Sequence, residues 1–325
     1  MYRILIFVFL FLSVLNAVNN DFSRIYLNGG IYAVEKALNE DFVKKEFWID
    51  QLKDQNSSLG YYTKDCAIVL INKKNKTFDL FYYENGKLIN KFFQKNILTG
   101  LMGDKKIEGD LITPMGFYEL GKKFFPGDPY YGPFAFSTTY PNLFDRVNGK
   151  TGSGIWIHGY PLNGDRIDEM RTRGCIALFN DKLEEFSTLI KDKTVYVIIE
   201  EDKKVRANKD EISSILSSLF NWKKAWSEND INLYLSFYDK DKFKKYDKTD
   251  YKKFAESKKA IFSKNDKKTI SFSNINISPY PNVNNDKIFR ISFYEDYYTK
   301  NYQFKGDKIL YVRLDKDGKI KILSE

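Results

Sequence analysis

The spacing of apolar residues divides the chain into four regions, of which the first two are short. The first seventeen residues, MYRILIFVFLFLSVLNA, form one apolar block with a single basic residue. Between positions 30 and 55 apolar residues recur at intervals typical of amphipathic helices, so we expect one or two helices there. Helices this few cannot form a domain alone. They must pack on the next domain or on a second copy of the chain, so a homodimer through this arm is a hypothesis.

From about Tyr62 the third region follows the pattern of β-strands. The stretch CAIVLINKKNKTFDLFYYENGKLINKF holds apolar or alternating runs around KKNK, and then Asn85-Gly86 between two more apolar pairs. An Asn-Gly pair so flanked predicts a β-hairpin. GIWIHG and TVYVIIE are two further short strands, so the region is expected to be mainly β. A long loop over residues 124–148 is large enough to form a wall or lid over a site.

The fourth region begins after residues 202–210, DKKVRANKD, whose charges are typical of a linker. EISSILSSLFNWKKAWSENDINLYLSFY and YKKFAESKKAIF have the periodicity of amphipathic helices. KTISFSNINIS, IFRISFYEDYY and ILYVRLDKDGKIKILSE then follow as strands, the last with a turn at Asp317-Gly318. Helices followed by an antiparallel sheet predict a small α+β domain.

Length and the first segment bear on location. A chain of 325 residues predicts two or three folding units. Residues 1–17 have the layout of a secretory signal peptide and are too short to span a bilayer comfortably. No later stretch is apolar enough for a membrane span, so we expect a soluble mature protein outside the cytoplasm, in the periplasm if the cell has an outer membrane. An uncleaved anchor is the alternative.

The charge of the chain narrows the choice of partner. The formal net charge of +9 falls to +8 without the signal segment, whose only charged residue is Arg3. The lysines are spread along the chain without clustering, and the chain is expected to be exported, so we expect no nucleic-acid partner. A polyanionic wall polymer fits better. Lysines that only keep the surface soluble are the competing interpretation.

Two cysteines and one histidine limit the chemistry. In an oxidising compartment Cys66 and Cys175 could form a disulfide, although Cys66 opens the apolar run CAIVLI and is expected to be a buried strand residue. A single histidine rules out a zinc site built on several imidazoles, and there is no CxxC pair. We therefore expect neither a metal nor another cofactor.

Cys175 and His158 are the candidate reactive pair. A cysteine that attacks carbonyls needs a neighbour that takes its proton, and His158 is the only imidazole available. Proximity to His158 would lower the pKa of the Cys175 thiol. Gly174 lets the backbone approach a substrate closely, and the amides of Gly174 and Cys175 could face a developing oxyanion. On spacing alone the pair is either an acyl-transfer site or two packed core side chains. Asp165, Arg166 and Asp168, between them in the chain, are expected to be solvated turn residues.

The residues around this pair resemble a known signature. I-H-G at 157–159, followed by T-R-G-C-I at 172–176, is similar to the signature of the YkuD-type L,D-transpeptidase domain. Upstream, Thr113, Pro114 and Gly116 resemble that family's Thr-Pro-x-Gly segment. The resemblance covers roughly residues 64–200 and implies a YkuD-like β-sandwich that acts on peptidoglycan stem peptides.

The resemblance also implies roles for individual residues. Cys175 would attack the carbonyl of the third stem residue, a diamino acid at its L-centre, and expel the terminal D-alanine. His158 would act as base and then as acid, with the backbone carbonyl of Gly159 orienting its imidazole. Where the family often has a second histidine, this chain has Arg173. Arg173 is either a cation beside a substrate carboxylate or a solvated surface residue.

Two aromatic residues near the pair have alternative interpretations. Trp156 and His158 share one face of a strand by alternation, so Trp156 either packs under the imidazole or contacts the substrate. Tyr131, with Tyr130, lies in the 124–148 loop and either anchors that loop or covers the substrate.

The fourth region resembles another fold family. WKKAWSENDINLYLSFYD is similar to the first helices of NTF2-like domains, which are α+β folds with an open pocket. The whole chain is similar to the cell-shape L,D-carboxypeptidases of helical and curved epsilonproteobacteria, which trim tetrapeptide stems to tripeptides. We therefore expect a signal peptide over 1–17, a helical arm over 18–62, a mainly β catalytic domain over 63–201 and an α+β NTF2-like domain over 207–325. An L,D-transpeptidase and a non-catalytic wall-binding protein are the alternatives.

Overall fold

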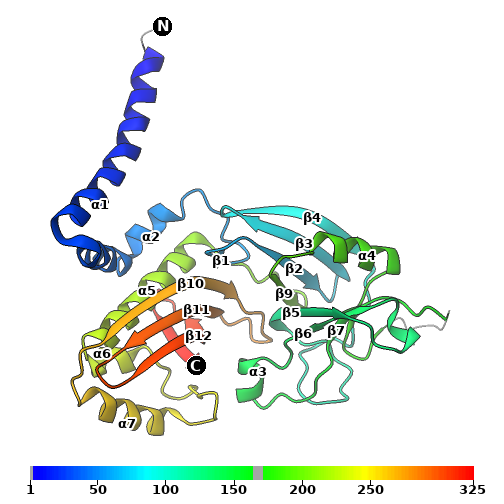
Figure 1. The fold of residues 1–325 in the computed structure, drawn as a ribbon. Coiled ribbons are helices and arrows are strands. Elements are labelled where there is room, and N and C mark those ends of the chain that lie inside the picture. The colour runs from blue at the N-terminus through cyan, green and yellow to red at the C-terminus, as the bar shows by residue number, and fades with distance from the viewer. Residues whose placement is uncertain (1–2, 164–170) are drawn as a thin grey trace.

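The chain folds into two sheets with helices around them (Figure 1). The computed structural model describes the backbone of residues 3–163 and 171–325, and the side chains from residue 21 onward within these ranges. The predicted signal segment therefore lies outside the residues whose side chains are described, and Asp165, Arg166 and Asp168 lie outside the described residues altogether. Within the described ranges, no helix is both long enough and apolar enough to cross a membrane.

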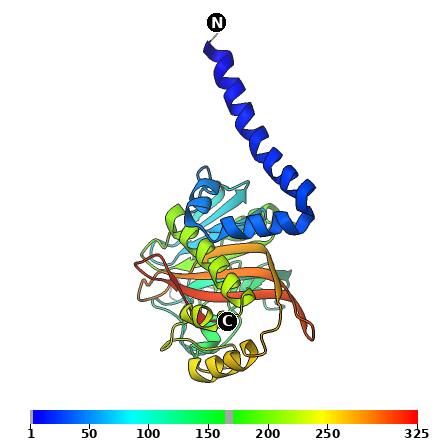
Figure 2. The same ribbon diagram turned by 90° about the vertical axis from the view of Figure 1, so that its left-hand side faces the viewer.

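Two helices form the predicted arm. Helix α1 (Arg3–Phe42) breaks at Gly30, whose φ of 68° and ψ of −166° are not helical, and α2 (Lys45–Gln51) follows. Before this break α1 projects away from the two sheets (Figures 1 and 2). After it, the Phe42 ring lies 4.7 Å from that of Phe220, and Trp48 is buried in the same cluster. The arm thus packs on helix α5 (Lys209–Ser227) of the C-terminal domain and not, as the sequence suggested, on the domain that follows it in the chain.

The larger sheet has eight strands, and the parallel pairs in it are β2 with β9 and β7 with β8. The turn between β3 and β4 holds Asn85 and Gly86 at φ 50° and 74°, which confirms the predicted hairpin. In order across the sheet the strands are β4 (Lys87–Lys95), β3 (Thr77–Glu84), β2 (Cys66–Asn72), β9 (Val195–Glu200), β5 (Gly116–Phe124), β6 (Ala135–Thr138), β7 (Trp156–His158) and β8 (Ile176–Ala177).

One core joins the two halves of this sheet. The register shifts within β5, between Leu120 and Lys123, where the sheet bends. Helix α4 (Asn180–Leu189) contributes Phe186, whose ring lies 5.1 Å from that of Phe78 in β3 and 5.7 Å from that of Phe136 in β6. Phe186 is fully buried. Helix α4 therefore packs against both halves in one core, which agrees with the expected mainly β, YkuD-like domain.

The expectation of one long loop over residues 124–148 is wrong. This segment contains a 3₁₀ turn, η1 (Pro129–Tyr131), then the strand β6, which pairs with both β5 and β7, and the helix α3 (Leu143–Val147). Asn142 and Asp145 form a reciprocal capping box at the start of α3. The turn-forming residues that predicted a loop thus separate short ordered elements.

The C-terminal domain places helices on an antiparallel sheet, as predicted. Its strands run in the order β1 (Tyr61–Tyr62), β10 (Thr269–Pro279), β11 (Ile288–Tyr298), β12 (Gln303–Leu314) and β13 (Ile320–Ser324). Helices α5, α6 (Ile231–Ser236) and α7 (Tyr251–Phe262) supply buried aromatic residues to its core. Gly318, at φ 72°, forms the predicted turn before β13. The sequence did not predict β1, which precedes the eight-stranded sheet in the chain and yet belongs to this one.

Polar side-chain contacts hold the two domains together. The Tyr280 hydroxyl lies 3.1 Å from Asn142 Nδ2 and donates to Asp145 Oδ1 at 3.2 Å. Arg290 forms an ion pair with Glu119 at 2.7 Å. The first contact joins Tyr280, just after β10, to the start of α3, and the second joins β11 to β5, so the two domains are connected by specific interactions rather than by the linker alone.

Replacing Phe186 tests the shared core of the eight-stranded sheet. Phe186→Ala is expected to lower the free energy of unfolding by about 3–5 kcal/mol, because it leaves a cavity between the two halves. Urea denaturation measures this change. Glu185→Gln is the control, because it removes only a surface ion pair with Lys182 and should change stability by less than about 1 kcal/mol. A loss below 1 kcal/mol for Phe186→Ala would contradict this description of the core.

Candidate active site

Two paired strands place the candidate residues side by side. Strands β7 and β8 run parallel, with Ile157 opposite Ile176 and His158 opposite Ala177. Because strand side chains alternate, the two buried isoleucines point to one face of the pair and His158 to the other. Cys175 precedes β8 by one residue and shares the face of His158. The structure therefore brings together the two residues that the sequence singled out.

Hydrogen bonds to its carbonyl fix the backbone of Cys175. That carbonyl accepts from the Thr172 hydroxyl at 2.6 Å and lies 3.4 Å from the Thr113 hydroxyl. Thr113 Oγ1 also accepts from Gly100 N at 2.7 Å. Gly174 has a φ of 119°, and a Cβ there would lie 3.1 Å from the Ile112 carbonyl oxygen, so a glycine is required. The Thr-Pro-x-Gly segment thus contacts the cysteine that it accompanies in the family signature.

The Gly174 amide is not free for its expected role as an oxyanion donor. Its N–H donates to the Thr172 hydroxyl at 3.2 Å instead of facing an open position. The sequence suggested the amides of both Gly174 and Cys175 as oxyanion donors. In this structure the first of them is already engaged.

The expectation of a lowered thiol pKa is also wrong. Burial raises the pKa of the Cys175 thiol to about 11, and this effect exceeds the opposing effects of the Trp156 backbone N–H and of Lys105. The sulfur donates to the Gly154 carbonyl at 3.3 Å. In the described part of the chain it has no hydrogen bond to the imidazole, so no ion pair forms between Cys175 and His158.

His158 is buried and neutral. Its side chain is 1% exposed, and burial lowers its pKa to about 4, against the opposing effect of the Gly159 carbonyl. Nδ1 lies 2.7 Å from that carbonyl oxygen. A carbonyl only accepts, so Nδ1 carries the proton and Nε2 keeps its lone pair. At neutral pH the side chain is therefore a free base with a fixed tautomer.

Aromatic rings line one side of His158. The ring of Tyr131 lies edge-on to the imidazole at 5.1 Å and 5.0 Å from Trp156. Trp156 in turn lies 5.0 Å from Phe124. Trp156 thus packs against Tyr131 and supports the ring that touches the imidazole. Burial raises the pKa of the Tyr131 hydroxyl, and the charge of the exposed Arg173 opposes this effect only in part.

The sequence did not single out Lys73, which holds the backbone of Thr113 beside Cys175. Its side chain is fully buried, and burial lowers its pKa to about 8. Nζ donates to the carbonyl of Thr113 at 2.8 Å and also to that of Gly103. Lys73 lies in the polar run KKNK, so only its buried position distinguishes it from a surface lysine.

Both cysteines are free thiols, so the possible disulfide is not formed. Cys66 is buried at the start of β2, as predicted. Across the described ranges, no three histidine, cysteine, aspartate or glutamate side chains converge as metal ligands do.

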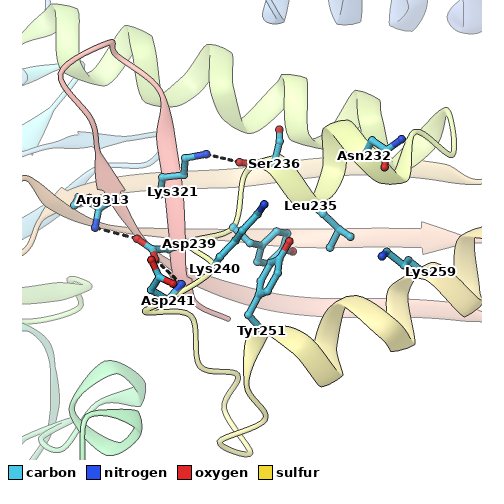
Figure 3. Close-up of a pocket in the computed structure, with 11 residues that line it drawn as sticks. Asn232, Leu235, Ser236, Asp239, Lys240, Asp241, Tyr251, Lys259, Arg313 and Lys321 are labelled. Carbon is cyan, nitrogen blue, oxygen red and sulfur yellow. Dashed lines mark hydrogen bonds and ion pairs between the residues drawn. The ribbon is translucent and has the colours of Figure 1, made fainter.

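The C-terminal domain has a charged pocket of its own, lined by neither Cys175 nor His158 (Figure 3). Its volume is about 590 Å³, and it opens between α6, α7 and the strands β12 and β13. Arg313 pairs with Asp239 at 2.9 Å, and Lys321 donates to the Ser236 carbonyl at 2.5 Å. Lys240, Tyr251 and Lys259 complete the polar rim drawn in Figure 3.

Two family models match the chain. Residues 67–199 match the L,D-transpeptidase catalytic domain (YkuD), and residues 214–325 match the Cds6 C-terminal NTF2-like domain. Among curated proteins, the provisionally named L,D-transpeptidase YafK of Escherichia coli (strain K12) is 28% identical over 131 residues, which are 39% of this chain. The chain spans about half the length of this relative, 48%.

Solved structures extend the similarity across both domains. Two crystal structures of the helical cell shape determining protein Pgp2 from Campylobacter jejuni, one of them a single-residue mutant, are 62% identical to this chain. They cover 87% of it and 98% or 99% of their own length, with TM-scores of 0.86 and 0.84. Bd1075 of Bdellovibrio bacteriovorus is 27% identical over 82% of this chain and 95% of its own, with a TM-score of 0.64. This chain therefore belongs to the family of Pgp2, with an L,D-transpeptidase catalytic domain followed by a C-terminal NTF2-like domain.

Proposed function

We propose that this chain is a peptidoglycan L,D-carboxypeptidase that removes the terminal D-alanine from tetrapeptide stems and thereby influences cell shape. The observation that carries the proposal is the strand pair that sets Cys175 on the same face as a neutral, tautomerically fixed His158. The similarity to Pgp2, a helical cell shape determining protein, supports the biological role. In this proposal Cys175 is the nucleophile and His158 is the base.

The chemistry follows from two neutral partners. Substrate binding brings the thiol to Nε2 of His158, which takes its proton as the sulfur bonds to the carbonyl carbon of the third stem residue. The bond to D-alanine then breaks, and the imidazolium returns the proton to the leaving amine. Water, deprotonated by the same nitrogen, then attacks the acyl carbon, the bond to sulfur breaks, and the imidazolium returns the proton to the thiolate as the tripeptide leaves. The Gly159 carbonyl stabilises the transient imidazolium through Nδ1–H.

The developing oxyanion needs a donor other than Gly174. Because the Gly174 N–H is bound to Thr172, we assign the role to the backbone N–H of Cys175 itself. Thr113 and Thr172 hold the Cys175 carbonyl, so the local backbone cannot rotate freely around the nucleophile. We propose Tyr131, whose ring packs on the imidazole, and the exposed Arg173 as substrate contacts, with Trp156 packed behind Tyr131.

Hydrolysis and transpeptidation share the same acyl-enzyme. They differ in whether a second stem peptide reaches the thioester before water does. Tyr131 of η1 packs on His158 and β6 pairs with β7, and we propose that this ordered segment limits the access of a second stem peptide and so favours water. We also propose that the protein acts in the periplasm after export through residues 1–17, with the peptidoglycan stem as its partner.

The first prediction concerns D-alanine release from purified disaccharide-tetrapeptide, followed by mass spectrometry. Cys175→Ala should reduce release at least about 10³-fold because it removes the nucleophile. His158→Gln should reduce it about 10²- to 10⁴-fold because it removes the base. Cys66→Ala is the matched control and should leave the rate within about twofold, since that thiol lies in the core of β2.

The products decide between the candidate reactions. Tripeptide with free D-alanine indicates a carboxypeptidase. A direct link between two diamino acids, formed when acceptor stems are added, would make the protein a transpeptidase. If no product forms in a Cys175-dependent way, a non-catalytic binding role is the remaining candidate.

The second prediction concerns the resting thiol. With a thiol pKa of about 11, alkylation of Cys175 by iodoacetamide should accelerate about tenfold for each pH unit from 7 to 10, because only the thiolate reacts. Peptide mapping separates Cys175 from Cys66. A fast rate that is flat across this range would instead indicate a preformed thiolate and imidazolium pair, and would contradict the neutral resting state.

The third prediction concerns assembly. Tyr26, Leu27, Ile31 and Tyr32 expose apolar surface on α1, with 83% of Leu27 exposed, and we propose that a second copy of the chain covers it. Residues 18–325 should then sediment as a dimer, and Leu27→Glu combined with Ile31→Glu should sediment as a monomer. A monomer at all concentrations before mutation would refute this interface.

A further inference from the structure

The peptide group between Gly159 and Tyr160 is hydrogen-bonded at both ends. Its carbonyl oxygen lies 2.7 Å from Nδ1 of His158, and its N–H donates to the side-chain oxygen of Asn180 at 2.8 Å. A peptide group is planar and rigid, so a side chain that holds the N–H also sets the direction of the carbonyl. Asn180 is thus connected to the imidazole through one rigid unit.

Two glycines make room for the Asn180 side chain. A Cβ at Gly159 would lie 2.2 Å from Asn180 Oδ1. Gly132 has a φ of 73°, and a Cβ there would lie 2.8 Å from the same oxygen and 2.7 Å from the Gly159 Cα. No real Cβ occupies such positions, so the close approach of Asn180 to this peptide depends on glycine at both places.

Asn180 stands on a well-anchored element. It is the first residue of α4, which Leu183 and Phe186 fix in the core with fully buried side chains. The neighbouring ring of Phe179 stacks on that of Tyr160 at 5.0 Å and 16°. The start of this helix therefore contacts the segment after His158 both through a ring and through the Asn180 oxygen.

The Asn180 oxygen does not serve its own helix. Asparagine near a helix start commonly caps the helix with its side chain, but here the N-cap position is Phe179, which makes no side-chain cap. The oxygen instead accepts from the Tyr160 N–H, which belongs to the segment after β7. Helix capping thus gives no reason for an asparagine at this position, and the contact with the peptide group does.

We propose that Asn180 is a positioning residue for His158. Its side-chain oxygen holds the Gly159 to Tyr160 peptide so that the carbonyl keeps the proton on Nδ1 and leaves Nε2 free to accept the thiol proton. Hydrogen bonding at the N–H also polarises the carbonyl, which strengthens the bond to Nδ1 by about 10–30%. The effect on rate rests on the proposed function, whereas the effect on the imidazole tautomer does not.

The single histidine makes the test direct. In residues 18–325 labelled with ¹⁵N-histidine, every imidazole signal belongs to His158. The ¹⁵N shifts of Nδ1 and Nε2 at pH 7 report which nitrogen is protonated, independently of activity. The variants are Asn180→Leu, which keeps the size and loses the acceptor, and Asn180→Asp, which keeps an acceptor oxygen. Asp181→Asn is the control, because it changes an exposed residue on the same helical turn.

We expect the unmodified chain, Asn180→Asp and Asp181→Asn to protonate Nδ1 alone. In Asn180→Leu the two ¹⁵N shifts should move toward each other as the tautomers mix. D-alanine release by Asn180→Leu should fall about 10- to 100-fold in kcat with little change in KM, because the base is misoriented while the substrate contacts remain. Asn180→Asp should stay within about threefold of the unmodified chain.

A folded Asn180→Leu variant with unchanged ¹⁵N shifts would overturn the proposal. If this variant does not fold, Asn180→Ala is measured in the same way and its shifts decide. A loss of activity in Asn180→Leu with an unchanged tautomer would also contradict it, because the loss would then come from elsewhere. If no chain releases D-alanine, the proposed function fails while the shifts still decide the role of Asn180.

Discussion

Parallel pairing of β7 with β8 is the constraint on which the site depends. It sets His158 opposite Ala177 and keeps both strands buried through Ile157 and Ile176, whose side chains have no exposed surface. Residues remote in the chain are thereby held at neighbouring positions on one sheet face. Without this pairing, the thiol and the imidazole would belong to separate segments with no fixed geometry.

The supports around the pair act mainly through the backbone. On the cysteine side, Thr172 and Thr113 hold the carbonyl of Cys175, and buried Lys73 holds the carbonyl of Thr113 in turn. On the histidine side, the Gly159 carbonyl receives Nδ1–H. Such a site is rigid, but Cys175 and His158 are both uncharged at rest, since burial favours the neutral thiol and the neutral imidazole. Charge would form only when substrate is bound and water is displaced.

Much of this arrangement could be predicted from the sequence. The Asn85-Gly86 hairpin, the Asp317-Gly318 turn and the order of domains follow from local patterns, because turn chemistry and apolar spacing act over a few residues. The proximity of His158 and Cys175 followed from a motif. The neutral state of the thiol could not be predicted, since it depends on burial by segments distant in the chain. Short elements such as β1 and α3 are below the length at which periodicity is informative.

The roles of Lys73 and Asn180 were not predictable for a related reason. Each is a residue type common on surfaces or in turns. Only the tertiary fold turns its polar atoms toward a particular peptide group. The C-terminal pocket is a similar case, because α6, α7 and two strands assemble its charged rim from positions far apart in the sequence (Figure 3).

The most direct test of the central claim, that Cys175 is the nucleophile, is to trap the acyl-enzyme. The mature chain would be mixed with disaccharide-tetrapeptide, quenched in acid within the first turnover and mapped by peptide mass spectrometry. The account predicts a disaccharide-tripeptidyl thioester on the peptide that contains Cys175, with one equivalent of D-alanine released. Release of D-alanine with Cys175 unmodified at every quench time, or an adduct on another residue, would contradict it.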